Sequence, residues 1–254
     1  MTDGKPEDAI AKVPAVTLGF WIIKILATTL GETGGDTLSM TYELGYLASS
    51  AVFVVPLGLL VAAQIRARGF HPLLYWATIL ASTTAGTTMA DFATRSLGIG
   101  YPGGSVLLLG CVLAALAAWK VALGSIAVET VSSARAELFY WATITFSQTL
   151  GTALGDWAAD DGGLGYLGGA ALFGGSLTIL VLAWKFTSVS RVWLFWAAFI
   201  LTRPLGATVG DFLDKPIAKG GLDFSRPLAT AVLGAAILLL VFALPQRAGR
   251  HPEA

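Results

Sequence analysis

Four aspartates recur at matched places in apolar sequence within this 254-residue chain. They are Asp36, Asp91, Asp156 and Asp211. The first stands in "GETGGDTLSM" (31–40), where Glu32 precedes Asp36 by one helical turn. Carboxylate oxygens suit hard cations such as Mn²⁺, Mg²⁺ and Ca²⁺, and carboxylates crowded in a low dielectric take up protons or recruit cations. The residue types and spacing therefore indicate the chemistry of cations and protons.

A longer motif surrounds every aspartate. It can be written W-x9-G-x3-[GA]-D-x8-G-[YG], and its copies begin at Trp21, Trp76, Trp141 and Trp196. Successive copies are 55, 65 and 55 residues apart, and the extra residues fall around "GSIAVETVSSARAE". The chain therefore consists of four tandem repeats arranged as two pairs, at about 15–68, 69–128, 134–188 and 189–245.

Each repeat contains two apolar stretches joined by a Gly-rich connector. Only 13% of the residues are charged, against about 25% in ordinary soluble domains, and the mean hydropathy is +0.72. A bilayer is spanned by about 20 apolar residues. The sequence predicts an all-α integral membrane protein with eight transmembrane helices and a pseudo-fourfold arrangement. We expect one membrane domain (15–245) between tails 1–14 and 246–254.

The distribution of basic residues predicts the orientation. Ten Lys and Arg residues lie in the tails and between repeats, against four in the connectors within repeats. The positive-inside rule then places both tails in the cytoplasm. Aromatic residues near the ends of the stretches are expected to anchor the helices at the membrane interface. They include Trp21, Trp76, Trp119, Trp141, Trp184, Trp193 and Trp196.

Polar residues follow one face of the first helix of every repeat. Steps of four and eight residues back from each Asp keep to that face. The stripe comprises Lys24, Thr28, Glu32 and Asp36; Thr83, Thr87 and Asp91; Gln148, Thr152 and Asp156; and Arg203, Ala207 and Asp211. Because lipid cannot solvate it, the stripe must face the interior of a bundle. We expect the four first helices to surround a polar core, with the second helices outside.

This arrangement predicts stacked layers. The outer layer holds the four aspartates, the middle layer holds Glu32 with Thr87 and Thr152, and the inner layer holds Thr28, Thr83, Gln148 and Arg203. Small residues four apart, such as Gly31 and Gly35, permit close helix packing. The five carboxylates are the predicted metal ligands, the Thr and Gln side chains further binding residues, and Lys24 and Arg203 countercharges or gates. With those two cations the interior carries a formal charge of −3.

Other interpretations of single residues stay open at this stage. Each Asp is also a suitable cap for a helix, and Thr in a membrane helix commonly bonds its own backbone. Lys24 has a side chain long enough to reach the membrane interface.

Several classes of function are excluded. One cysteine (Cys111) and two histidines beside prolines (His71, His251) do not make a thiolate or imidazole metal site. The first 14 residues lack the features of a signal peptide. The chain has no nucleophile with a base and no phosphate loop, so we expect no enzyme activity and no cofactor. A net charge of zero does not favour nucleic acid.

On these repeats, the chain resembles a bacterial family of uncharacterised membrane-anchored proteins with four tandem repeats of unknown function. The resemblance covers nearly all of residues 15–245 and implies eight helices in the bacterial inner membrane. In addition, "ETGGDT" (32–37) is similar to the Glu-x-Gly-Asp-Lys/Arg-Thr/Ser signature of an Mn²⁺/Ca²⁺ transporter family. Here the Glu-to-Asp spacing is one residue longer and the basic residue is absent.

The sequence therefore predicts a secondary transporter that exports a divalent cation, with Mn²⁺ favoured, in exchange for protons. Its partners would be the lipid bilayer, the transported cation and protons, and a homo-oligomer is compatible with the sequence. The alternatives are transport of a small organic cation or polar metabolite, a passive channel, or a structural membrane protein whose stripes bind its helices together.

Overall fold

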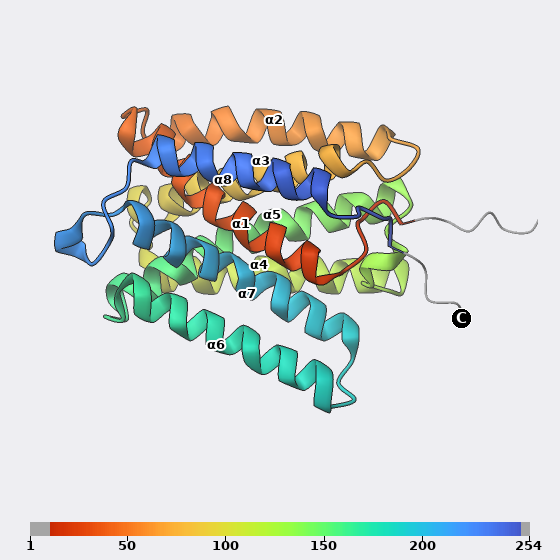
Figure 1. Cartoon of the computed structure of the whole chain (residues 1–254). Helices are drawn as coiled ribbons and strands as arrows, with labels where there is room; N and C mark the ends of the chain where they lie inside the picture. Colours follow the sequence, from red (N-terminus) through yellow and green to blue (C-terminus); the bar gives the residue numbers. More distant parts are fainter. Residues whose placement is uncertain (1–10, 250–254) are drawn as a thin grey trace, which may run out of the picture.

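The structure, a computed structural model, describes residues 11–249, so the outer parts of both predicted tails lie outside it. In this range the chain forms eight α-helices, two in each repeat (Figure 1). They are α1 (Leu18–Asp36), α2 (Tyr46–Arg66), α3 (Pro72–Asp91), α4 (Gly100–Leu123), α5 (Ala134–Asp156), α6 (Gly165–Phe186), α7 (Arg191–Asp214) and α8 (Arg226–Ala243). The predicted all-α fold class is confirmed.

Short turns follow the first helix of each repeat. After α1, α3 and α5 the backbone continues as one turn of π-helix, at η1 (Thr37–Thr41), η2 (Phe92–Ser96) and η4 (Trp157–Asp161). The fourth repeat instead has the 3₁₀ turn η5 (Ile217–Lys219). A further 3₁₀ turn, η3 (Val128–Thr130), lies in the longer linker between the two pairs of repeats.

The odd-numbered helices form a closed ring. Along this ring α1 contacts α3, α3 contacts α5, α5 contacts α7, and α7 returns to α1. Each even-numbered helix packs outside, mainly against the odd helix of the next repeat: α2 on α3, α4 on α5 and α6 on α7. The last helix, α8, packs on α1 and so completes the cycle (Figure 1).

Glycines on the odd helices receive stripe side chains from the next helix of the ring. A Cβ added at Gly35 would lie 2.8 Å from Cβ of Thr87, and one added at Gly210 would lie 2.7 Å from Cβ of Glu32. The equivalent Cβ at Gly155 would lie 3.0 Å from Cβ of Ala207. The small residues of the motif therefore bring neighbouring helices together, because a larger residue would hold them apart.

Apolar side chains cover the outside of the ring. Five helices are long and apolar enough to cross a membrane, by length and composition: α2, α4, α6, α7 and α8. Exposed Leu, Val, Ile and Phe side chains lie along the even helices, for example Leu59, Leu109, Ile179 and Phe242. The remaining helices, α1, α3 and α5, carry much of the polar stripe. The fold is compatible with a membrane protein.

Aromatic residues fill the side of the ring where the odd helices begin, which we call the tail side. Trp76, Trp119, Trp141 and Trp196 are at most 3% exposed. The indole of Trp196 donates to the carbonyl of Ile126 over 2.9 Å. The prediction that these four residues anchor the helices at an interface is therefore wrong, because they are buried against other aromatic side chains of the protein.

The segment before α1 crosses the tail side. Its backbone pairs with the segment after α8, through Ala15 N to Arg247 O and Gly249 N to Val13 O, both 2.8 Å. In the same segment, Nζ of Lys12 lies 2.6 Å from Oε1 of Glu137 at the start of α5. The segments that flank the first and fourth repeats thus meet, and the first of them reaches across to the third repeat.

The contact between α6 and α7 supplies a test of this packing. A Cβ at Gly169 would lie 2.8 Å from the methyl carbon of Thr208. We expect Gly169→Ala to lower the free energy of unfolding by about 1–2 kcal/mol, as overpacking usually does. Thr208→Ser removes that methyl group but retains the hydroxyl that donates to the Pro204 carbonyl, so the double variant should recover most of the loss.

Denaturation of the detergent-purified variants measures this effect. Gly174→Ala is the matched control on the same helix, because no atom lies within 4 Å of a Cβ at that position. An equal loss in the control, or no recovery in the double variant, would contradict the described contact.

Candidate ion-binding core

Every residue predicted for the polar core is buried inside the ring. The exposed fractions are 0–3% for Lys24, Thr28, Glu32, Asp36, Thr83, Thr87, Asp91, Gln148, Thr152, Asp156, Arg203 and Asp211. The helical step of four residues places these side chains on the inward faces of α1, α3, α5 and α7. A continuous polar column therefore fills the ring.

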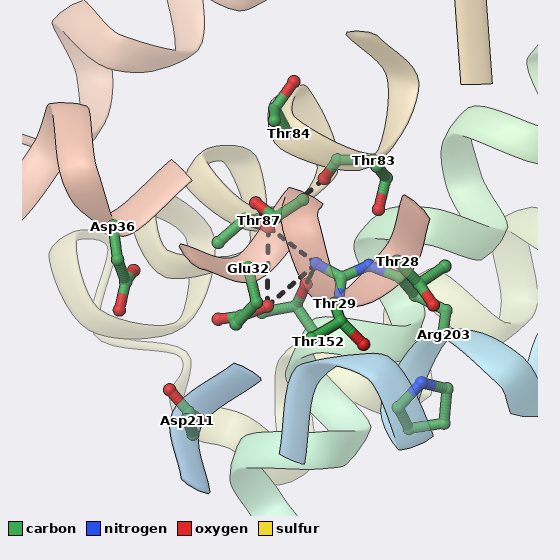
Figure 2. Close-up of polar contacts among 12 residues, drawn as sticks. Thr28, Thr29, Glu32, Asp36, Thr83, Thr84, Thr87, Thr152, Arg203 and Asp211 are labelled. Atoms are coloured by element: carbon green, nitrogen blue, oxygen red, sulfur yellow. Dashed lines mark hydrogen bonds and ion pairs between the residues drawn. The ribbon is translucent and has the colours of Figure 1, made fainter. Parts of the chain in front are cut away.

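One guanidinium holds the middle layer together. Nη2 of Arg203 donates to Oε2 of Glu32 over 2.9 Å, to Oγ1 of Thr87 over 2.6 Å, and to Oγ1 of Thr152. These acceptors stand on α1, α3 and α5, while Arg203 comes from α7 (Figure 2). The side chain thus links all four ring helices. Its backbone lies in the predicted inner layer, but its charge lies in the middle layer.

The outer layer contains two bridged pairs of aspartates. Nζ of Lys215 lies 2.5 Å from Oδ2 of Asp36 and 2.9 Å from Oδ1 of Asp211. In the second pair, Nε of Arg95 lies 3.0 Å from Oδ1 of Asp91, and its Nη2 lies 3.1 Å from Oδ2 of Asp156. The predicted layer of four aspartates is therefore divided into two pairs, Asp36 with Asp211 and Asp91 with Asp156.

Sequence reasoning missed these two countercharges. Lys215 and Arg95 each follow the Asp of their own repeat by four residues, which brings their side chains back to the stripe. The first and third repeats have Met40 and Asp160 at the same place. When Lys215 and Arg95 are included, the formal interior charge becomes −1 instead of the predicted −3.

The environment of Lys215 keeps it protonated. Burial disfavours the ammonium, but Asp211, Asp36 and Asp214 outweigh that cost and raise the pKa of Lys215 well above its usual value. A second cation, Arg226, lies 3.2 Å from Asp214 and 3.9 Å from Asp36 through its Nε. The aspartates of the first and fourth repeats are therefore held by two basic side chains, one directly after α7 and one at the start of α8.

Three carboxylates come close enough to share a cation. Oxygens of Glu32, Asp36 and Asp211 all lie within 4.8 Å of one another, and all three side chains are buried. Figure 2 shows Asp36 and Asp211 on the side of Glu32 away from the guanidinium of Arg203. Asp91 and Asp156 are not part of this group. The structure thus brings together three of the five predicted metal ligands.

The inner layer differs from the other two. Oγ1 of Thr28 donates to the backbone carbonyls of Ile25 and Thr202. Within the described range, the side chains of Thr83 and Gln148 have no hydrogen-bond partner. Lys24 is fully buried, with its Nζ 4.2 Å from the ring centroid of Phe199. The alternative that Lys24 reaches the interface is therefore wrong.

The capping interpretation of the aspartates is also wrong where it can be examined. The α-helical geometry ends at Asp36, Asp91 and Asp156, and none of these side chains makes a capping hydrogen bond to the π-helical turn that follows. Several threonines do bond their own backbone, as the sequence allowed. Thr87 accepts from Arg203 as well as bonding to the carbonyls of Gly31 and Thr83.

Four two-helix repeats closed around a buried polar core define an all-helical tandem-repeat protein. The chain belongs to the family described as Repeat of Unknown Function (DUF347), which matches residues 19–70, 74–124, 139–190 and 194–247. The resemblance to a family with four tandem repeats of unknown function is thereby confirmed. No curated protein and no solved structure matches the chain.

Proposed function

We propose that the protein is an eight-span secondary transporter that exports a divalent cation, with Mn²⁺ favoured, in exchange for protons. The observation that carries this proposal is the group of Glu32, Asp36 and Asp211, whose oxygens lie within 4.8 Å of one another. This group is buried in a ring of helices whose outer surface is apolar. Ionisable residues at that depth in a membrane commonly mark an ion or proton pathway.

The apolar outer surface of the helices supports an eight-span arrangement. The five apolar helices are long enough to cross a bilayer. Helices α1, α3 and α5 belong to the same ring as α7 and begin on the same side of it (Figure 1), so they would cross together with it. Odd helices begin and even helices end on the tail side (Figure 1). The positive-inside rule favours the cytoplasm for that side and the bacterial inner membrane for the whole protein.

The proposed exchange centres on Lys215. Its ammonium lies between Asp36 and Asp211, two of the three clustered carboxylates. A divalent cation would replace the ammonium there and take Glu32 as a third ligand. An all-oxygen ligand set suits Mn²⁺, Mg²⁺ or Ca²⁺. On the return step, protons on the same carboxylates would replace the cation and preserve the charge balance.

A structural role is the second candidate, and one observation favours it. Arg203 on α7 already donates to Glu32, Thr87 and Thr152, which come from the three other ring helices. Such a contact would strengthen the ring without any transport. A small organic cation or polar metabolite is the third candidate.

Mn²⁺ binding to the detergent-purified protein tests the proposed site. We expect Lys215→Met to tighten Mn²⁺ binding by about tenfold or more, because the cation no longer competes with an ammonium for Asp36 and Asp211. Asp36→Asn should weaken binding by a similar factor. Isothermal titration calorimetry measures both constants.

Arg95→Met is the matched control, because it removes the equivalent bridge from the other pair of aspartates. It should leave the Mn²⁺ constant within about twofold, a change of less than 1 kcal/mol. In liposomes, Asp36→Asn should abolish proton-linked Mn²⁺ flux. Organic cations that bind where Mn²⁺ does not would favour the third candidate, and the absence of any binding would leave the structural role.

A further inference from the structure

The inner layer of the core and the guanidinium next to it contain buried polar groups that the proposed cation site does not use. They are Nζ of Lys24, the side-chain amide of Gln148 and the hydroxyl of Thr83, together with Nε and Nη1 of Arg203. Each residue is fully buried, and none of these atoms has a hydrogen-bond partner in the described part of the chain. A buried polar group without a partner is costly, and a buried charge without one is more so.

The residues that carry these groups stand at nearly the same level of the ring. Thr83, Gln148 and Arg203 occupy equivalent positions of α3, α5 and α7, eight residues before the aspartate of each repeat. Their neighbours in the preceding repeat are Gly31, Gly86 and Gly151, against which they pack directly. Lys24 lies one turn closer to the tail side on α1, and its Nζ lies over the ring of Phe199, one turn before Arg203 on α7. One ligand at this level could therefore meet several of them.

The hydrogen-bonding capacity of these unpaired groups indicates the class of ligand that they would bind. Lysine and arginine nitrogens are donors only, Gln148 offers two donors with one acceptor, and Thr83 can donate its hydroxyl proton. Donors thus greatly outnumber acceptors. Lys24 makes no ion pair among the described residues, and its contact with the ring of Phe199 offsets only part of the cost of burying its charge. Glu32 lies two helical turns away and already accepts from Nη2 of Arg203.

We propose that this inner layer is an anion-binding site for a small monovalent anion, a halide or a carboxylate group, held by Lys24, Gln148, Thr83 and one of the two unpaired nitrogens of Arg203, Nε or Nη1. Such a ligand supplies acceptors to all four side chains and neutralises charge, whereas water supplies donors and acceptors equally and leaves the charge in place. The carboxylate cluster lies toward the connector side, so the core combines an anion site and a cation site along one axis.

Thermal unfolding of the detergent-purified full-length protein tests this site. Chloride or formate replaces gluconate at constant ionic strength, and the melting temperature is recorded against anion concentration. We expect a saturable rise for the wild type. Lys24→Met and Gln148→Leu should each raise the half-saturating concentration by about tenfold or more, as the loss of a charge-assisted hydrogen bond does.

Two controls separate this result from other effects. Lys185→Met removes a lysine that also lies over a phenylalanine ring, Phe186, but on an exposed surface, and it should leave the response unchanged. Asp36→Asn should likewise retain the anion response while weakening Mn²⁺ binding, so failure of the cation proposal and failure of the anion proposal are distinguishable.

The outcomes decide the proposal. A response to formate without chloride would identify a carboxylate-bearing ligand, and a response to both would identify a site for small anions in general. The absence of a saturable response in the wild type would overturn the proposal. So would an unchanged response in Lys24→Met, or in Gln148→Leu should the lysine variant fail to fold.

Discussion

Arg203→Met is expected to lower the free energy of unfolding by about 3–5 kcal/mol, the usual cost of removing one partner of a buried ion pair. The substitution leaves Glu32 as an uncompensated carboxylate at 2% exposure. It also removes the donor shared by Thr87 and Thr152, so α7 loses the hydrogen bonds of this guanidinium to three other ring helices at once. Unfolding of the purified variant in mixed micelles, followed by tryptophan fluorescence, measures the change.

A second substitution distinguishes the ion pair from simple packing. Arg203→Met combined with Glu32→Met leaves no buried charge in the middle layer, and apolar replacement of a buried ion pair is often neutral or stabilising. The double variant should therefore be more stable than Arg203→Met alone. Arg191→Met is the control, because Arg191 is exposed at the start of α7. A loss below about 1 kcal/mol in Arg203→Met, the range of exposed ion pairs, would contradict the described contact.

Gly206→Ala is expected to separate α1 from α7 and to cost about 3 kcal/mol or more, at the upper end of overpacking. The added Cβ would overlap the side chain of Thr28 and come within 2.7 Å of its backbone carbonyl carbon. A backbone atom cannot rotate away, so α1 itself has to move. Thermal unfolding of the purified variant measures the loss.

The comparison with Gly169 sharpens this expectation. At Gly169 the nearest atom is a methyl group of Thr208, and trimming that side chain relieves the contact. At Gly206, Thr28→Ser should bring little recovery because the backbone contact remains. Gly174→Ala again serves as the control. Full recovery with Thr28→Ser would show that the two helices approach less closely than described.

The ring and the place of its polar residues could be predicted from sequence because the repeat fixes a common register. Once the aspartates are aligned, a step of four residues selects one helical face, and burial in an apolar chain directs that face inward. Glu32, Thr87 and Arg203 were assigned to the core on this basis, and all three are buried there. The grouping into layers failed at Arg203, whose long side chain carries its charge from the inner to the middle layer.

The countercharges could not be assigned in the same way. Arg95 and Lys215 lie after the apolar stretches, where sequence composition alone suggests a solvated connector. Their side chains turn back toward the aspartates because the backbone remains helical through η2 and to the end of α7. The spacing of four residues after the Asp, in the second and fourth repeats, is the pattern that would have revealed them.

Contacts between repeats were the other feature beyond sequence reasoning. Trp76 and Trp141 occupy positions typical of interfacial anchors, and only the arrangement of neighbouring helices shows that they are covered. Similarly, no periodicity within a repeat indicates that its second helix packs on the next repeat, since that choice depends on how four units close into a ring.

Because α8 packs on α1 as α2 packs on α3, the four repeats form a closed cycle in which no repeat is structurally the first. The segments around Pro14 and Ala248 already pair with each other, so a peptide link between them would cross little space. A circularly permuted chain would be opened between α2 and α3 and joined between the segments around Pro14 and Ala248. It would contain the same helix contacts with the helices in a different order along the chain. Every repeat completes its neighbour, so the structural unit of this fold is the joint between two repeats, formed by one outer helix and the ring helix that follows it.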